Sequence, residues 1–124
     1  MWIFTQEGMI SVVKNSQKLG HTLVRARTKE CLPKLLDAAR MPEYKSKIEH
    51  TPRNDYEYRV SMPKLDFRAL MSGVMDNLTY TNFKEHLQKK NKMNAIQRNM
   101  YHAVYMAALE PIIKSLKHVS RYYD

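Results

Sequence analysis

Leu23-Val24-Arg25-Ala26-Arg27-Thr28 and Asp55-Tyr56-Glu57-Tyr58-Arg59-Val60-Ser61-Met62 are two short runs in which apolar and polar side chains alternate. A period of two is typical of a β-strand whose two faces meet different surroundings. In the first run it separates Val24 and Ala26 from Arg25 and Arg27. In the second run the face opposite Arg59 carries Tyr56, Tyr58, Val60 and Met62.

If the arginine faces line the open side of one sheet, Arg25, Arg27 and Arg59 form a cluster of guanidinium groups. Forked guanidinium donors bind phosphate and carboxylate well, so we name these residues as a candidate ligand-binding site. The alternative is an exposed sheet face on which the arginines pair across strands with Asp55 and Glu57.

Aromatic side chains near this cluster could stack on a nucleic-acid base while the arginines hold phosphate. The candidates are Tyr56, Tyr58 and Trp2. The two tyrosines lie on the face of their strand opposite Arg59, which favours a core position for them.

The elements expected before Lys64 are strands at 2–5, 9–14 and 21–28, a helix at 32–40, and a hairpin of strands at 44–51 and 55–62. Gly8 and the run 15–20 supply turns between the first strands. Cys31, near the start of the helix, reads as a small apolar residue and not as a reactive thiol.

From Lys64 onward the apolar spacing becomes helical. Asp66 is the expected N-cap of one helix, and Asn82 with Glu85 resembles a capping box that opens a second. A third helical stretch is expected at 93–123, where Pro111 should kink or restart the helix.

This order predicts an α+β fold, in which an antiparallel sheet of about five strands with one intervening helix is packed by C-terminal helices. We expect a single domain over 1–124, with a strand-rich part at 1–63 and a helical part at 64–124. The start of the chain lacks a basic leader, and no apolar run has the length of a membrane span, so we expect a cytoplasmic protein.

The chain carries a formal net charge of +9, from 21 basic and 12 acidic residues. Residues 84–124 hold 8 basic and 3 acidic groups, so the excess is densest at that end. A weak, sequence-independent nucleic-acid face is one interpretation, and a solvated surface is the other. The candidate contacts are Lys84, Lys89, Lys90, Lys92 and Arg98.

The five histidines are scattered and none stands at metal-ligand spacing from a cysteine or another histidine, so we expect no metal, no cofactor and no catalytic residues. The C-terminal helix carries Tyr101, Tyr105, Tyr122 and Tyr123. Tyrosine is enriched at buried contacts, so this helix is a candidate surface for self-association.

The opening Met1-Trp2-Ile3-Phe4-Thr5-Gln6-Glu7-Gly8 resembles the start of a family of small bacterial and phage proteins of unassigned activity. The resemblance continues through 23–27, the strand at 55–59, the segment Tyr80-Thr81-Asn82-Phe83-Lys84 and the aromatic-bearing stretch 101–105. It implies a bacterial or phage setting and no particular mechanism.

Charge, arginine pattern and setting together predict a small non-enzymatic protein that captures a phosphate-bearing ligand, either a nucleotide signal or nucleic acid. In a phage setting such a protein could act as an inhibitor or sponge against host defence. Two alternatives stay open: an inhibitor that docks on a host protein through its helical face, and a sequence-nonspecific nucleic-acid-binding accessory protein.

Overall fold

The computed structural model describes residues 1–89 and 95–123, with side chains described as far as Lys117 in the last helix. By its internal contacts the chain divides into two compact units, 1–92 and 93–124. The prediction of a single domain over the whole chain stays a prediction.

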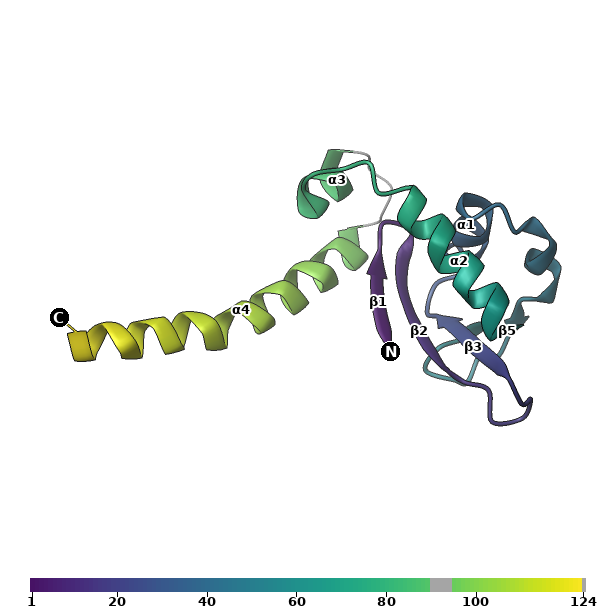
Figure 1. Cartoon of the computed structure of the whole chain (residues 1–124), viewed down its shortest axis with the longest axis horizontal. Coiled ribbons are helices and arrows are strands. Elements are labelled where there is room, and N and C mark those ends of the chain that lie inside the picture. The colour runs from purple at the N-terminus through teal and green to yellow at the C-terminus, as the bar shows by residue number, and fades with distance from the viewer. Residues whose placement is uncertain (90–94, 124) are drawn as a thin grey trace. The chain divides into compact units, whose positions relative to one another are not determined.

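The first unit is built on a five-stranded antiparallel sheet with the strand order β1-β2-β3-β5-β4, of which Figure 1 labels β1, β2, β3 and β5. The strands are β1 (Trp2–Thr5), β2 (Gly8–Lys14), β3 (His21–Ala26), β4 (Glu49–His50) and β5 (Tyr58–Pro63). The predicted α+β fold and its sheet of about five strands are therefore confirmed.

One face of this sheet forms the hydrophobic core, as the alternation in β3 and β5 predicts. Val24, Ala26, Val60 and Met62 are each no more than 1% exposed. They pack with Ile10 of β2 and with leucines of the helices that cover this face. The alternate residues of the same strands therefore point to the opposite face, which we call the open face.

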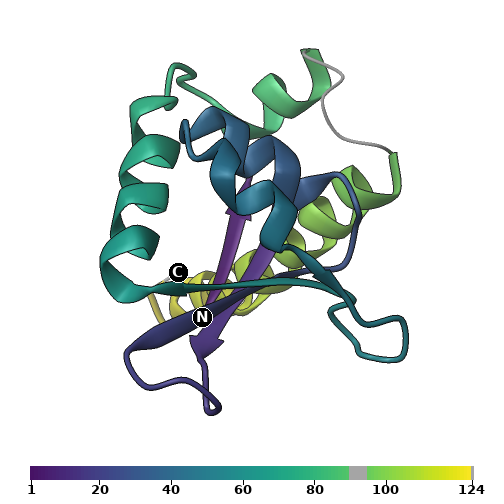
Figure 2. The same cartoon turned by 90° about the vertical axis from the view of Figure 1, so that its right-hand side faces the viewer.

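Two helices of the first unit cover the core face: α1 (Cys31–Ala38) and α2 (Lys64–Asp76) contact each other and the central strands (Figures 1 and 2). Pro33 fits in the first turn of α1 because amide groups there need no partner within the helix. The helix ends at Ala38 with Ala39 as its C-cap, and the positive φ of 58° at Arg40 lets the amide of Met41 return to the carbonyl of Leu36.

The predicted strand at 44–51 is wrong over most of its length. Pro42–Lys47 forms a short 3-10 helix, η1, and only Glu49–His50 remains as β4. Local hydrogen bonds such as Tyr44 N–H to Met41 C=O turn the backbone, and the buried ring of Tyr44 fixes it against the core.

The predicted N-cap of α2 is also wrong. The helix begins at Lys64, one residue after the end of β5, so Asp66 lies inside its first turn. Its carboxylate accepts a hydrogen bond from the Tyr44 hydroxyl, which ties η1 to α2. Burial, followed by this hydrogen bond, raises the pKa of Tyr44 to about 12.

The remaining helices are α3 (Phe83–Lys89) in the first unit and α4 (Ala95–Tyr123), which is the described part of the second. The side chain of Asn82 accepts a hydrogen bond from the amide of Glu85 at 3.0 Å, as expected for a cap. The long helix continues through Pro111, so of the two predicted alternatives, a kink or a restart, the restart does not occur. None of the described helices has the length and hydropathy needed to cross a bilayer.

Candidate anion-binding site

A single row of side chains crosses the open face of the sheet from one edge to the other. The strand register aligns Trp2 with Ser11, Ser11 with Arg25, Arg25 with Arg59, and Arg59 with Glu49. Directly paired residues in antiparallel strands project to the same face. The row therefore has an aromatic residue at one end, two arginines near the middle and a carboxylate at the other end.

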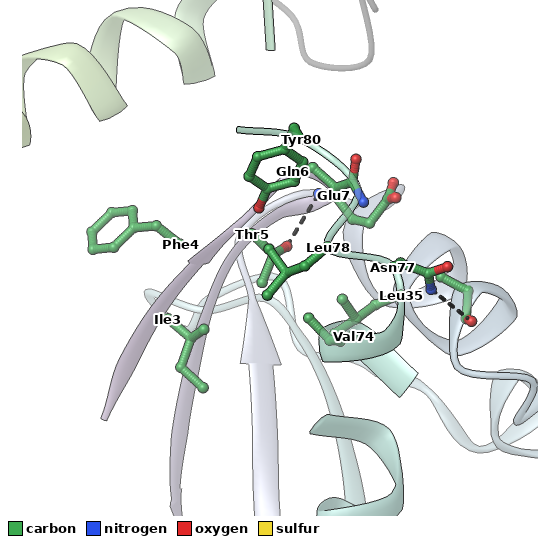
Figure 3. A pocket seen from close by; sticks show the side chains of 11 residues that line it. Ile3, Phe4, Thr5, Gln6, Glu7, Leu35, Val74, Asn77, Leu78 and Tyr80 are labelled. Carbon is green, nitrogen blue, oxygen red and sulfur yellow. Dashed lines mark hydrogen bonds between the residues drawn. The ribbon is translucent and has the colours of Figure 1, made fainter. Parts of the chain in front are cut away.

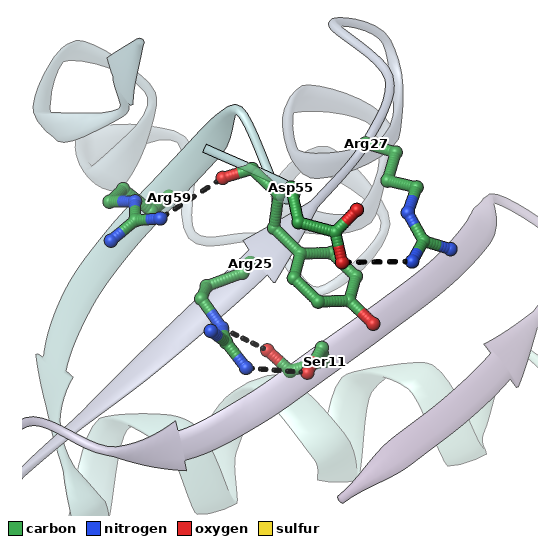
Figure 4. Close-up of polar contacts among 6 residues, drawn as sticks. Ser11, Arg25, Arg27, Asp55 and Arg59 are labelled. Carbon is green, nitrogen blue, oxygen red and sulfur yellow. Dashed lines mark hydrogen bonds and ion pairs between the residues drawn. The ribbon is translucent and has the colours of Figure 1, made fainter. Parts of the chain in front are cut away.

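Arg25 is anchored to the neighbouring strand. Its Nη2 donates to the hydroxyl of Ser11 at 2.8 Å, and its Nε reaches the carbonyl of Ser11 at 3.5 Å (Figure 4). Both acceptors are neutral, so the charge of Arg25 is held in place without being neutralised. Sequence reasoning missed Ser11 because its part in the site depends on the register between β2 and β3.

Arg59 lies directly opposite Arg25. Its guanidinium donates to the carbonyl of Tyr56 at 3.1 Å, as Figure 4 shows. Its Nε is buried and has no hydrogen-bond partner in the part of the chain that the structure describes. A buried donor without a partner is costly, and like charges placed directly opposite one another across strands repel.

Arg27 differs from the other two arginines. It follows the last residue of β3 and forms an ion pair with Asp55 at 3.2 Å, in which both side chains are substantially exposed (Figure 4). The alternative of pairing with an acidic residue thus holds for Arg27, although Arg27 and Asp55 both lie just outside the strands. Glu57 pairs with His50 instead, and within the described residues neither Arg25 nor Arg59 forms an ion pair.

Tyr56 does not occupy the core position that strand alternation predicted. The strand β5 begins two residues later, at Tyr58, so the alternation does not extend to Tyr56. Its buried ring contacts both neighbouring guanidinium groups, with the Cζ of Arg25 4.7 Å and that of Arg27 4.5 Å from the ring centroid. The ring therefore supports the arginine cluster by cation–π contacts.

The other two aromatic candidates lie in different places. Tyr58 packs against the core and stacks on His50 at 4.5 Å between ring centroids, so it is not part of the arginine row. Trp2 lies on the open face in β1 and is 67% exposed. Of the three aromatic residues, Tyr56 touches the arginines and Trp2 is free to meet a ligand.

The basic residues named near the C-terminal end lie on other elements than this row. Lys84 and Lys89 are exposed on α3, and Arg98 is half-buried on α4 in the second unit. Lys90 and Lys92 lie outside the described residues. The nucleic-acid face suggested for these five residues therefore stays a prediction.

A hollow opens on the helix-covered side of β1 and has a volume of about 170 Å³ (Figure 3). Its lining is mostly apolar, with Ile3, Leu35 and Val74 below a rim that includes Gln6 and Tyr80. Burial raises the pKa of Tyr80. With no cationic lining residue, this hollow is poorly suited to an anion.

The chain matches no family model, no curated protein and no solved structure. In the described residues, no group of three His, Cys, Asp or Glu side chains is arranged to hold a metal ion.

Proposed function

We propose that this protein binds a phosphate-bearing ligand on the open face of its sheet, with Arg25 and Arg59 as the two residues that hold the phosphate. The observation that supports this proposal is the direct pairing of these two arginines across β3 and β5. Like charges in that position destabilise an empty sheet, and an anion placed between them converts the repulsion into two attractions.

The hydrogen-bonding state of the pair supports the same ligand chemistry. A guanidinium group carries five N–H donors in a planar fork, and a phosphate oxygen can accept from two of them. Arg25 and Arg59 use only some of these donors on neutral oxygens. The remaining donors are the groups that a tetrahedral anion would satisfy.

Ser11 and Tyr56 position this pair. Ser11 is buried beneath Arg25, and its hydroxyl accepts a hydrogen bond from one guanidinium nitrogen of Arg25. The backbone carbonyl of Tyr56 accepts a hydrogen bond from Arg59, and the ring of Tyr56 contacts the guanidinium of Arg25. Both anchors are neutral and leave the positive charge intact. We also propose that, in a bacterial or phage setting, a small protein with such a site would sequester a phosphate-bearing signal.

The experiment is a calorimetric titration with pyrophosphate as the probe. Arg25→Lys and Arg59→Lys keep the charge and remove the fork, so each should weaken binding about tenfold or more, as expected for a lost charge-assisted hydrogen bond. Arg68→Lys, a matched substitution at an exposed position on α2, should leave the affinity unchanged. Unchanged affinity in both site variants, or no binding by the wild type at low salt, would overturn the proposal.

A further inference from the structure

We infer that the ligand of the open face is a mononucleotide, with its base stacked on Trp2 and its phosphate between Arg25 and Arg59. This inference rests on the proposed function and adds two claims to it. The first is that an aromatic base is part of the recognised ligand. The second is that the ligand is small and not a nucleic-acid strand.

The position of Trp2 supports the first claim. Trp2 belongs to the same transverse row as Arg25, two strands away, and neighbouring strands lie about 4.8 Å apart. The intervening residue in that row is Ser11, whose small, buried side chain lies beneath the guanidinium of Arg25. Base, sugar and phosphate of one nucleotide would extend along this row in that order.

The exposure of Trp2 adds to the first claim. A tryptophan that is 67% exposed on a sheet face leaves much of its aromatic surface in water, although burial of such a ring is strongly favourable. Every nucleic-acid base has a π-face that can cover it. A sugar phosphate or inorganic phosphate would engage the arginines and leave the indole uncovered.

The limited extent of the positive charge supports the second claim. The next row on the open face consists of Val13, Leu23 and Ser61, which are uncharged. On the other side, Asp55 already pairs with Arg27. A strand of nucleic acid needs cationic contacts that follow several successive phosphates, and this face offers them for one position.

Glu49 further limits the length of the ligand. It is exposed and lies directly beyond Arg59 in the row, at the edge formed by β4. A polymer that continued past the arginines would bring its next phosphate towards this carboxylate, which would repel it. Glu49 therefore limits the phosphate site at one end of the row, and the stacking surface of Trp2 limits it at the other end.

The test compares the binding of three probes to the intact chain in one buffer: AMP, ribose 5-phosphate and a short oligothymidylate. AMP should bind about tenfold or more tightly than ribose 5-phosphate, because only AMP can stack on the indole. Trp2 is the only tryptophan, so its fluorescence should change with AMP and hardly at all with ribose 5-phosphate.

Variants of Trp2 separate stacking from phosphate binding. Trp2→Leu should reduce the affinity for AMP to that for ribose 5-phosphate and leave the latter unchanged, whereas Trp2→Phe should recover most of the loss. Because the side chain is largely exposed, neither substitution should lower the melting temperature by more than a few degrees. Tyr105→Leu, at an exposed aromatic position on α4, serves as the matched control and should change neither affinity.

The outcomes distinguish this inference from the proposed function. Equal affinity for AMP and ribose 5-phosphate would overturn the nucleotide inference and leave phosphate capture standing. Failure of pyrophosphate, ribose 5-phosphate and AMP alike to bind would overturn both. Oligothymidylate binding tighter than AMP, with a log K against log salt slope steeper than about −2, would overturn the inference in favour of a polymer, since each single-strand phosphate contributes roughly −0.7.

Discussion

Gly8, at the start of β2, lies against the thiol of Cys31 at the start of α1. A Cβ atom added at Gly8 would come within 2.7 Å of the cysteine sulfur, and the backbone there has φ of +137°. Side chains of L-residues rarely adopt this backbone conformation. At this position steric crowding and backbone strain act together, so the turn between β1 and β2 requires glycine.

Gly8→Ala should therefore lower the free energy of unfolding by about 2 kcal/mol or more, because it combines strain with a clash in a packed region. Gly20→Ala is the matched control, since Gly20 also has a positive φ, of +77°, but nothing lies within 4 Å of its added Cβ. Urea unfolding of both variants measures the difference. Equal losses would show that the contact with Cys31 contributes nothing.

At the scale of residues, the sequence predicted which side chains belong to the candidate site better than it predicted their partners. Arg25 and Arg59 share the open face as the alternation required. Their alignment, and the burial of Ser11 beneath Arg25, depend on strand register, which two separate runs of sequence do not specify. The sequence therefore identified the arginines of the candidate site but not their arrangement relative to neighbouring residues.

At the scale of elements, the crossing of α1 and α2 depends on Gly73. A Cβ atom added there would lie 2.6 Å from the Cα of Ala39, which is backbone and cannot move without shifting the end of α1. Asn77 strengthens the same junction, since its Nδ2 donates at 3.0 Å to the carbonyls of Ala38 and Gly73. Close approach of the two backbones is therefore a requirement of this packing.

Gly73→Ala tests this requirement, because helix propensity and packing predict opposite signs. Alanine is favoured over glycine in a helix interior by about 1 kcal/mol, but overpacking typically costs about 1–3 kcal/mol. We expect a net loss of stability, measured by thermal or urea unfolding. Ser72→Ala, at the adjacent exposed position, should be neutral or slightly stabilising. A more stable Gly73→Ala variant would contradict the close crossing.

Elements with a regular period were predicted well, and those set by tertiary contacts were not. The first three strands and the helix at Cys31–Ala38 follow directly from alternation and from the position of Pro33. The 3-10 helix at Pro42–Lys47 does not, because burial of Tyr44 and its bond to Asp66 decide the local backbone there. Neither contact can be read from residues 42–47 alone.

At the scale of the whole molecule, two buried groups that can lose a proton make the stability of the fold depend on pH in the alkaline range. Burial, followed by the negative charge of Glu7, raises the pKa of Cys31 from 9.0 to about 12. Burial likewise raises the pKa of Tyr44 from 10.0 to about 12, with the hydrogen bond to Asp66 as the next cause. At pH values between the ordinary and the raised pKa of these groups, the folded protein binds more protons than the unfolded chain does.

Stability should therefore be fully present below about pH 9 and fall as the pH rises towards 12. The slope is on the order of 1.4 kcal/mol per pH unit for each group that stays protonated only when folded. Urea unfolding at about pH 8 and about pH 10.5 measures this loss. Cys31→Ala should reduce the pH dependence between these two values even though it lowers stability at both, and an unaltered dependence would exclude the thiol as a cause.

The contacts of Tyr56 with both Arg25 and Arg27 have a consequence for the kinetics of recognition. A free arginine side chain loses about 2 kcal/mol of rotamer entropy when it is immobilised, and many binding sites incur that cost when the ligand arrives. Here the ring, together with the Ser11 hydroxyl, holds Arg25 in place during folding. Under the proposed function the site would thus be preorganised: an anion would meet a fixed receptor and associate at a rate set by electrostatic steering, without waiting for side chains to rearrange.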